Sequence, residues 1–280
     1  MIRARLKGLM SPVSVTARVF YPGDRAPGPD FDPAAAPIGI GDARALQAEA
    51  ASEAAFFATR GFVLLDHRPS PDWGESEAAR PAIEAIVRER LFAGRRVEIA
   101  RWLDPVHRGG GEDAVYADWV HQDFGLTADD FARNLAGIVD PEAARAWRER
   151  YDSADVTGCV AISFWRTLGL TQPLRHMPLA LCDPGSVAMA DVLPAAPAQA
   201  GDGNYHIALR FDAAQLWYHY PAMRSDELLA FKLFECRKDD PAPERLRSVF
   251  HTAFEDPAAS ADTERRRSCE HRLVVMLLAD

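Results

Sequence analysis

The sequence predicts a mainly β protein with flanking helices, built as a double-stranded β-helix of the jelly-roll, cupin-like type. Three observations support this fold class. The 280 residues are 48% hydrophobic and 26% charged, which is ordinary globular composition. From Arg96 onward, short strand-like runs follow one another between turn residues. No regular helices separate these runs, which argues against a doubly wound α/β sheet.

Residues 1–95 are expected to form an arm and helices that pack on the core. Up to about residue 40 the chain is rich in Pro, Gly and Ala, which is typical of an extended surface arm. Two stretches with helical spacing of apolar residues follow, and Asp42 is placed to cap the first of them. The elements expected here are a strand over 15–21, a helix over 42–59, a strand over 61–66 and a helix over 75–92.

Residues 96–280 are expected to form the jelly-roll core. A helical insertion interrupts it near 127–152, where Asp140-Pro141-Glu142 is a typical helix start. Residues 193–203 read as a loop that could act as a lid. The strands expected in the core are 96–103, 115–124, 158–167, 179–182, 205–211, 216–220, 228–235, 248–254 and 267–278. We treat the whole chain, 1–280, as a single domain.

Charge and cysteine content restrict the partners. Asp and Glu number 41 against 32 Lys and Arg, a net charge of −9, which disfavours binding to a phosphate backbone. No apolar run approaches the roughly 18 residues of a membrane span, and the basic start is not followed by an apolar stretch. The four cysteines form no CxxC pair, as expected for reduced thiols. The sequence therefore predicts a cytoplasmic protein that acts on a small molecule, with neither nucleic acid nor membrane as partner; a homodimer stays open.

Two histidines and an aspartate are the candidate metal ligands. His121 and Asp123 lie two residues apart in a strand-like run, so their side chains share one face. Such a pair arises by chance about once in this composition, so a third ligand is needed. His251 opens a late strand, which jelly-roll topology can place beside an early one. His121, Asp123 and His251 would then form a facial triad suited to non-haem Fe(II), although zinc could take the same ligands.

The last strand carries charged residues in an unusual place. Strand periodicity puts Arg266, Ser268, Glu270 and Arg272 on one face, just before a wholly apolar run. Buried arginines are costly unless they meet an anion. A guanidinium and a hydroxyl two residues apart can clamp a carboxylate, and 2-oxoglutarate could reach from that clamp to the metal. The alternative is an internal ion pair of Glu270 with Arg266 or Arg272.

Three blocks of sequence resemble a known family, the hydroxylase/desaturase family of non-haem iron, 2-oxoglutarate-dependent oxygenases. That family includes cephem 7α-methoxylase components and fungal secondary-metabolite enzymes. The resemblance runs from about residue 60, where Gly61-Phe62-Val63-Leu64-Leu65 looks like an N-terminal block of the family, to the end of the chain. The blocks are Val120-His121-Gln122-Asp123; Phe164-Trp165-Arg166-Thr167-Leu168 with Pro178–Asp183, Gln215–Met223 and Asp226–Leu229; and His251–Pro257 with Arg266–Arg272.

The resemblance implies an oxygenase domain over 1–280 that uses Fe(II), 2-oxoglutarate and O₂. Iron would be bound by His121, Asp123 and His251. The cosubstrate 2-oxoglutarate would be bound by Arg266 with Ser268, and Arg272 matches a family arginine of the same pocket. The implied reaction oxidises a C–H bond of a small organic, secondary-metabolite type of substrate, by hydroxylation or desaturation, and releases succinate and CO₂. One departure is Ser163, which stands where the family often has Asn before its Trp-Arg pair.

Four residues are candidates for contact with the substrate: Trp165, Arg166, Trp217 and Tyr218. For Trp217 and Tyr218 the alternative is a core position, and for Trp165 and Arg166 it is a packed indole beside a surface arginine. Other histidines carry no predicted role. His206 is expected to be solvated near a loop, and His219 to be half-buried in a strand.

Two other classes of function remain open. A metal-dependent hydrolase or isomerase on a cupin-like barrel could use the same His/Asp/His site without 2-oxoglutarate. A catalytically silent binding module would result if the three ligands did not meet in space. Substrate identity and oligomeric state are not encoded in any motif of the sequence.

Overall fold

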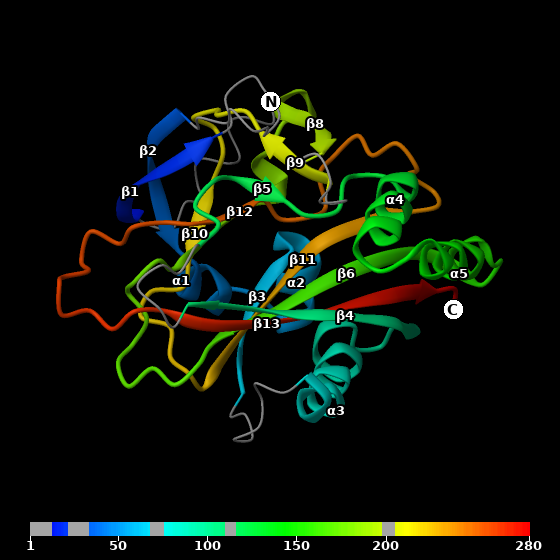
Figure 1. The fold of residues 1–280 in the computed structure, drawn as a ribbon, viewed down its shortest axis with the longest axis horizontal. Helices are drawn as coiled ribbons and strands as arrows, with labels where there is room; N and C mark the ends of the chain where they lie inside the picture. Colours follow the sequence, from blue (N-terminus) through cyan, green and yellow to red (C-terminus); the bar gives the residue numbers. More distant parts are fainter. Residues whose placement is uncertain (1–12, 22–33, 68–75, 110–115, 198–204) are drawn as a thin grey trace.

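Two β-sheets face each other across the middle of the molecule (Figure 1). The computed structural model describes residues 13–21, 34–67, 76–109, 116–197 and 205–280. Within these residues, the larger sheet contains, in spatial order, β1 (Val13–Tyr21), β2 (Ala34–Asp42), β10 (Trp217–His219), β7 (Leu179–Cys182), β12 (His251–Ala253), β5 (His121–Gln122), β9 (Tyr205–Leu209) and β8 (Val192–Pro197). The smaller sheet contains β3 (Phe62–Asp66), β11 (Glu227–Arg237), β6 (Val156–Thr167), β13 (Arg267–Leu278) and β4 (Val97–Gly109).

The strand order joins segments that are distant in sequence. In the larger sheet β12 pairs with β5 and with β7, both antiparallel, although about 130 residues separate β12 from β5. In the smaller sheet the C-terminal β13 lies between β6 and β4. Pairing of late strands with early ones is the topology expected of a jelly roll. The predicted double-stranded β-helix is confirmed.

The central strands β11 and β6 of the smaller sheet are buried on both faces, which explains why they read as nearly continuous apolar runs. All but the last residue of β11 and all but one residue of β6 are buried. Helices cover the outer face, and the core combines Phe57 of α2 (Glu53–Arg60) and Ile83 of α3 (Ser76–Ile86) with strand residues such as Phe164. The inner face looks toward the other sheet. A π-helical turn, η3 (Val87–Leu91), continues α3.

The N-terminal part contributes strands to both sheets. β2 was expected to be surface arm, but Ile38 and Ile40 alternate inward, and the strand pairs with β1 on one side and with β10 on the other. The helix predicted over 42–59 is two helices, α1 (Ala43–Ala48) and α2, because Ser52 caps a new helix start. Asp42 caps α1 as predicted.

Other boundaries also differ from the prediction. The strand expected over 115–124 is reduced to β5, and residue 115 lies outside the described residues. The predicted loop over 193–203 begins as β8, which pairs with β9, and residues 198–204 are not described. Two 3₁₀ turns, Pro184–Ser186 and Met189–Asp191, connect β7 to β8. No helix in the described part of the chain is long and apolar enough to cross a membrane.

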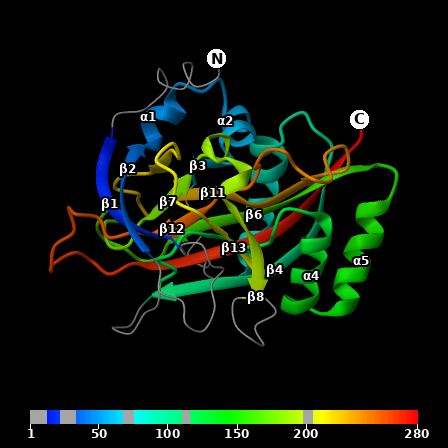
Figure 2. The same cartoon turned by 90° about the horizontal axis from the view of Figure 1, so that it is seen from above.

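The helical insertion is confirmed as a pair of helices, α4 (Ala128–Ile138) and α5 (Pro141–Asp152), which lie side by side at the edge of the sheets (Figure 2). Asp140 caps α5 through the backbone N–H of Ala143. The rings of Trp147 and Tyr151 stack with centroids 5.1 Å apart. The pair extends the core cluster of the smaller sheet through Trp147.

The start of α4 is held by a capping box, which can be tested by substitution. The Thr127 Oγ1 accepts from the Asp130 backbone N–H at 3.1 Å, and the Asp130 carboxylate accepts from the Thr127 backbone N–H at 3.0 Å. We expect Thr127→Ala to lower the free energy of unfolding by about 1 kcal/mol, the usual value of an N-cap. Urea unfolding measures this change. Thr127→Ser keeps the hydroxyl, so an equal loss in both variants would show that the cap is not responsible.

Candidate metal centre and its cavity

His121 and His251 are direct cross-strand neighbours. The register of β5 and β12 pairs them, and their ring centroids lie 4.4 Å apart. Asp123 follows β5 immediately and turns its carboxylate toward both rings. One ligand atom of each of His121, Asp123 and His251 lies within 4.8 Å of the other two. The three predicted ligands therefore meet in space, with a spacing that allows them to hold one metal ion.

Backbone carbonyl groups orient both imidazoles. The Nδ1 of His121 lies 2.8 Å from the Trp119 carbonyl oxygen, and the Nδ1 of His251 lies 3.3 Å from the Val249 carbonyl oxygen. Each Nδ1–H donates to its carbonyl, which leaves the Nε2 lone pair available as a ligand. This arrangement is the usual outer-shell support of a metal-binding histidine.

The protonation states suit metal binding. Burial, reinforced by the neighbouring His251, lowers the pKa of His121 to about 3, so its ring is neutral at physiological pH. Burial opposes ionisation of Asp123, but the adjacent His206 and the other surrounding imidazoles outweigh it and hold the pKa of Asp123 below its usual value. A neutral imidazole and an ionised carboxylate are the ligand forms that a divalent cation requires.

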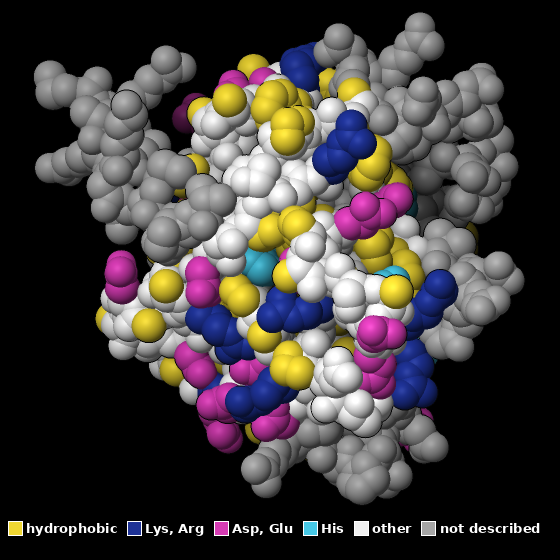
Figure 3. Space-filling view, turned by 90° about the vertical axis from the view of Figure 1, so that its left-hand side faces the viewer, with side chains coloured by type: hydrophobic (Ala, Val, Ile, Leu, Met, Phe, Trp, Pro, Cys, Tyr) yellow, Lys and Arg dark blue, Asp and Glu magenta, His cyan; other side chains and the backbone are white. Residues whose placement is uncertain are grey.

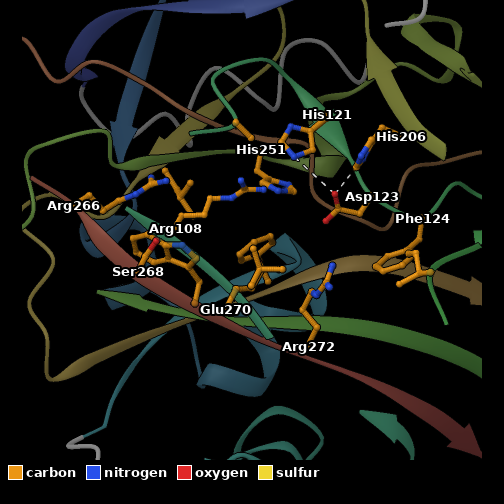
Figure 4. A pocket seen from close by; sticks show the side chains of 16 residues that line it. Arg108, His121, Asp123, Phe124, His206, His251, Arg266, Ser268, Glu270 and Arg272 are labelled. Carbon is orange, nitrogen blue, oxygen red and sulfur yellow. Dashed lines mark ion pairs between the residues drawn. The ribbon is translucent and has the colours of Figure 1, made fainter. Parts of the chain in front are cut away.

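The triad opens into a cavity of about 240 Å³ between the two sheets (Figure 4). Four alternate residues line the floor of the cavity, as strand periodicity predicts. They are Arg266, which directly precedes β13, and Ser268, Glu270 and Arg272 of β13. His271 points to the opposite side, where its Nε2 lies 3.5 Å from the Cys269 sulfur. Burial raises the pKa of the Glu270 carboxyl.

Arg266 is a buried cation without an acidic partner in the described residues. Only 2% of its surface is exposed, and its guanidinium lies 4.2 Å from the centroid of the Tyr116 ring and donates to the Met177 carbonyl. Its Nε has no hydrogen-bond partner. Burial lowers the pKa of Arg266 to about 10, so it stays charged at neutral pH. The alternative of an ion pair with Glu270 is not found among the described residues, either for Arg266 or for Arg272.

The four candidate substrate residues do not share one site. Trp165 lines the cavity, 5.5 Å from the Arg266 guanidinium. Arg166 follows it on β6 and therefore points to the other face, where it is buried and donates to the Ser225 carbonyl. Trp217 and Tyr218 are also buried, and they border a separate hollow beside β2. Both are core residues, as the alternative interpretation held.

Two residues of the cavity were missed or misjudged from the sequence. His206, expected to be solvated, lies with its Nδ1 3.3 Å from Asp123 Oδ1 (Figure 4). Arg108 of β4 lines the cavity near Arg266, opposite Ser268 in the strand register. Both positions depend on which strands are neighbours, and no local motif carries that information. His219 is buried, and its Nε2 lies 3.0 Å from the Ser14 hydroxyl.

His206 is placed to hold the Asp123 carboxylate in position. We expect His206→Ala to weaken divalent-metal binding by about 10- to 100-fold, as is usual when the partner of a metal ligand is lost. Competition with a chromophoric chelator for Co(II) measures this. His206→Asn keeps a donor near the Nδ1 position and should recover most of the affinity. If His206→Ala binds Co(II) as well as the unaltered protein, His206 does not orient Asp123.

The surface offers no extended basic region on the face shown in Figure 3. On this face, basic and acidic side chains are interspersed with hydrophobic side chains and a few histidine atoms. Of the three arginines among the described residues that line the candidate site's cavity, Arg266 is the buried one.

A His/Asp/His site between the two sheets of a double-stranded β-helix defines the structural class of this chain. A family model described as an oxidoreductase/YMDC permease-like domain matches residues 19–276, and the chain belongs to this family. No curated protein matches the sequence significantly.

Solved structures of the iron and alpha-ketoglutarate-dependent endoperoxidase NvfI share the fold. A variant of that enzyme is 20% identical with a TM-score of 0.70, and the match covers 97% of this chain and 99% of that chain. The enzyme itself is also 20% identical with a TM-score of 0.70, covering 95% and 98%. A third structure, in a different conformation, has 20% identity and a TM-score of 0.69, covering 96% and 100%.

Proposed function

We propose that this protein is an Fe(II)- and 2-oxoglutarate-dependent oxygenase that oxidises a C–H bond of a small organic molecule. The observation that carries the proposal is the buried Arg266 guanidinium, which opens on the same cavity as the His121, Asp123 and His251 triad. A metal site alone is compatible with several chemistries. A metal site with an unpaired buried cation in its cavity favours an anionic cosubstrate.

The triad fits iron by its donor set. His121, Asp123 and His251 supply two neutral nitrogens and one carboxylate, the set typical of non-haem Fe(II) oxygenases. These three ligands would leave open positions for a bidentate cosubstrate and dioxygen, and the bound iron would activate dioxygen, which is the oxidant. The residues of the chain bind and orient the metal, through the carbonyls of Trp119 and Val249 and through His206.

The Arg266 end of the cavity fits 2-oxoglutarate. Arg266 offers a guanidinium whose Nε has no partner, and Ser268 adds a hydroxyl from the same strand face. Arg108 adds a second positive charge nearby. A dicarboxylate would neutralise this end of the cavity, with its other end free to reach the metal.

The overall reaction is an oxidation with defined products. The cosubstrate loses CO₂ and becomes succinate by gaining one oxygen atom of O₂. The other oxygen atom enters the product as a hydroxyl group, or leaves as water when the substrate is desaturated. The similarity to an alpha-ketoglutarate-dependent endoperoxidase supports the same cosubstrate, and the family description supports an oxidoreductase. Hydroxylation and desaturation both agree with the site.

Formation of succinate tests the proposal. The Fe(II)-loaded protein should convert 2-oxoglutarate to succinate in air, and the conversion should require both Fe(II) and O₂. Candidate metabolites that are substrates should accelerate it. A zinc hydrolase or isomerase with the same triad would make no succinate, so a complete absence of succinate with every metabolite tested would favour that class instead.

A further inference from the structure

Glu270 and Arg272 form a second charged pair of side chains in the cavity, which the proposed function does not use. They lie two residues apart on β13 and both line the cavity. In Figure 4, Arg266 and Ser268 lie toward one end of the cavity, Arg272 and Phe124 lie toward the other, and Glu270 lies between, below the triad. The cavity is therefore polar at both ends.

Neither of these two side chains is neutralised by an ion pair. In the described part of the chain, no basic group lies within 4.0 Å of the Glu270 carboxylate and no carboxylate lies within 4.0 Å of the Arg272 guanidinium. Arg272 donates to the Asp104 carbonyl oxygen, at 3.0 Å from its Nη2 and 3.4 Å from its Nε. Opposite charges that face one cavity without pairing leave free binding capacity for a ligand that carries both complementary charges.

Arg272 lies away from Arg266 in the cavity. The two residues are six positions apart on an extended strand, which puts their α-carbons about 20 Å apart. Figure 4 shows them toward opposite ends of the cavity. We therefore assign Arg272 to a ligand other than the 2-oxoglutarate that Arg266 and Ser268 would hold, in place of the cosubstrate role that the family resemblance implies.

The geometry points to a free α-amino acid as the substrate, and we propose that its carboxylate binds Arg272 and its ammonium group binds Glu270. The inference rests on the proposed function. Residues i and i+2 of a strand lie about 6.5 Å apart, and the two charged groups of an amino acid fit between their side chains. Phe124 lies at the same end of the cavity and would contact an apolar side chain of the substrate.

The test is binding of amino acids to the protein loaded with Fe(II) and 2-oxoglutarate under anaerobic conditions. The twenty L-amino acids are compared by calorimetry with their N-acetyl derivatives and their primary amides. We expect at least one free amino acid to bind, and each of its two derivatives to bind about 10- to 100-fold more weakly, the cost of one charged hydrogen-bonded contact. If no amino acid binds, or if the derivatives bind equally well, the inference is wrong.

Variants assign each charge to its partner. Arg272→Gln should abolish the preference for the acid over its amide, and Glu270→Gln should abolish the preference for the amine over its N-acetyl form. Arg88→Gln, on an exposed arginine outside the cavity, should change neither preference. Unaltered preferences in Arg272→Gln and Glu270→Gln would contradict the assignment even if amino acids bind.

Titration of 2-oxoglutarate in the same samples separates this inference from the proposed function. Binding of 2-oxoglutarate without binding of any amino acid refutes the substrate class and leaves the oxygenase proposal standing. Failure of 2-oxoglutarate to bind refutes the oxygenase proposal. The amino acid titration is a separate measurement, so it still shows whether an amino acid binds in the cavity. In each variant, retained 2-oxoglutarate binding shows that the site is folded.

Discussion

Replacing His251 by alanine is expected to reduce the affinity for Fe(II) by more than about 100-fold. Loss of the outer-shell partner of a ligand already costs about 10- to 100-fold, and loss of a ligand itself removes a metal–nitrogen bond. Among the described residues, only His121, Asp123 and His251 bring ligand atoms within 4.8 Å of one another, so the variant keeps two of the three ligands. Metal content after dialysis, together with chelator competition, measures the effect.

His219 provides a matched control for this variant. It is a buried strand histidine like His251, but its Nε2 contacts the Ser14 hydroxyl and its ring packs on Phe254 at 5.4 Å. His219→Ala should bind Fe(II) as the unaltered protein does. Equal metal loss in both variants would mean that His251 acts through folding, and retention of Fe(II) by His251→Ala would remove it from the ligand set.

Replacing Arg266 by alanine is expected to raise the dissociation constant for 2-oxoglutarate by about 100-fold, while Fe(II) binding changes little. Truncating one partner of a buried charge pair commonly costs 2–5 kcal/mol. The guanidinium is buried beside Tyr116 and belongs to the opposite sheet from His121 and His251, so the metal ligands keep their support. Calorimetric titration of 2-oxoglutarate into the metal-loaded protein under anaerobic conditions gives the constant for 2-oxoglutarate, and chelator competition gives the constant for Fe(II).

Arg267 is the natural control because it is the neighbouring arginine on the other face. It is exposed, and its guanidinium donates to the Gly169 carbonyl oxygen at 3.1 Å. Arg267→Ala should leave 2-oxoglutarate binding unchanged. An equal loss of Fe(II) and 2-oxoglutarate binding in Arg266→Ala would contradict a role in holding the cosubstrate carboxylate.

The fold class followed from the sequence because strand periodicity is a local property. Residues 158–167 and 273–278 lie in central strands that are almost wholly buried, and their nearly continuous apolar character identified them closely. Segments whose structure depends on distant partners were harder. β2 is a strand because β1 and β10 flank it, and the proline and glycines in its sequence suggested an arm instead.

The site likewise combines residues that local sequence spacing identified with residues that only strand pairing brings into the cavity. His121 and Asp123 could be paired from their spacing, and the alternation of Arg266, Ser268, Glu270 and Arg272 placed them on one face. His206 and Arg108 reach the cavity from strands whose neighbours are set by tertiary pairing, β9 with β5 and β4 with β13. Trp165 and Arg166 were both candidates for contact with the substrate because they are adjacent in one sequence block. Adjacent strand residues point to opposite faces, so only Trp165 lines the cavity.

The most direct measurement is the visible absorption of the protein after anaerobic addition of Fe(II) and 2-oxoglutarate. If His121, Asp123 and His251 hold iron and Arg266 holds the cosubstrate, a weak metal-to-ligand charge-transfer band should appear on mixing. The band should be absent in His251→Ala, and in Arg266→Ala it should require about 100-fold more 2-oxoglutarate. No band in the unaltered protein, with Fe(II) demonstrably bound and 2-oxoglutarate in excess, would contradict the oxygenase proposal.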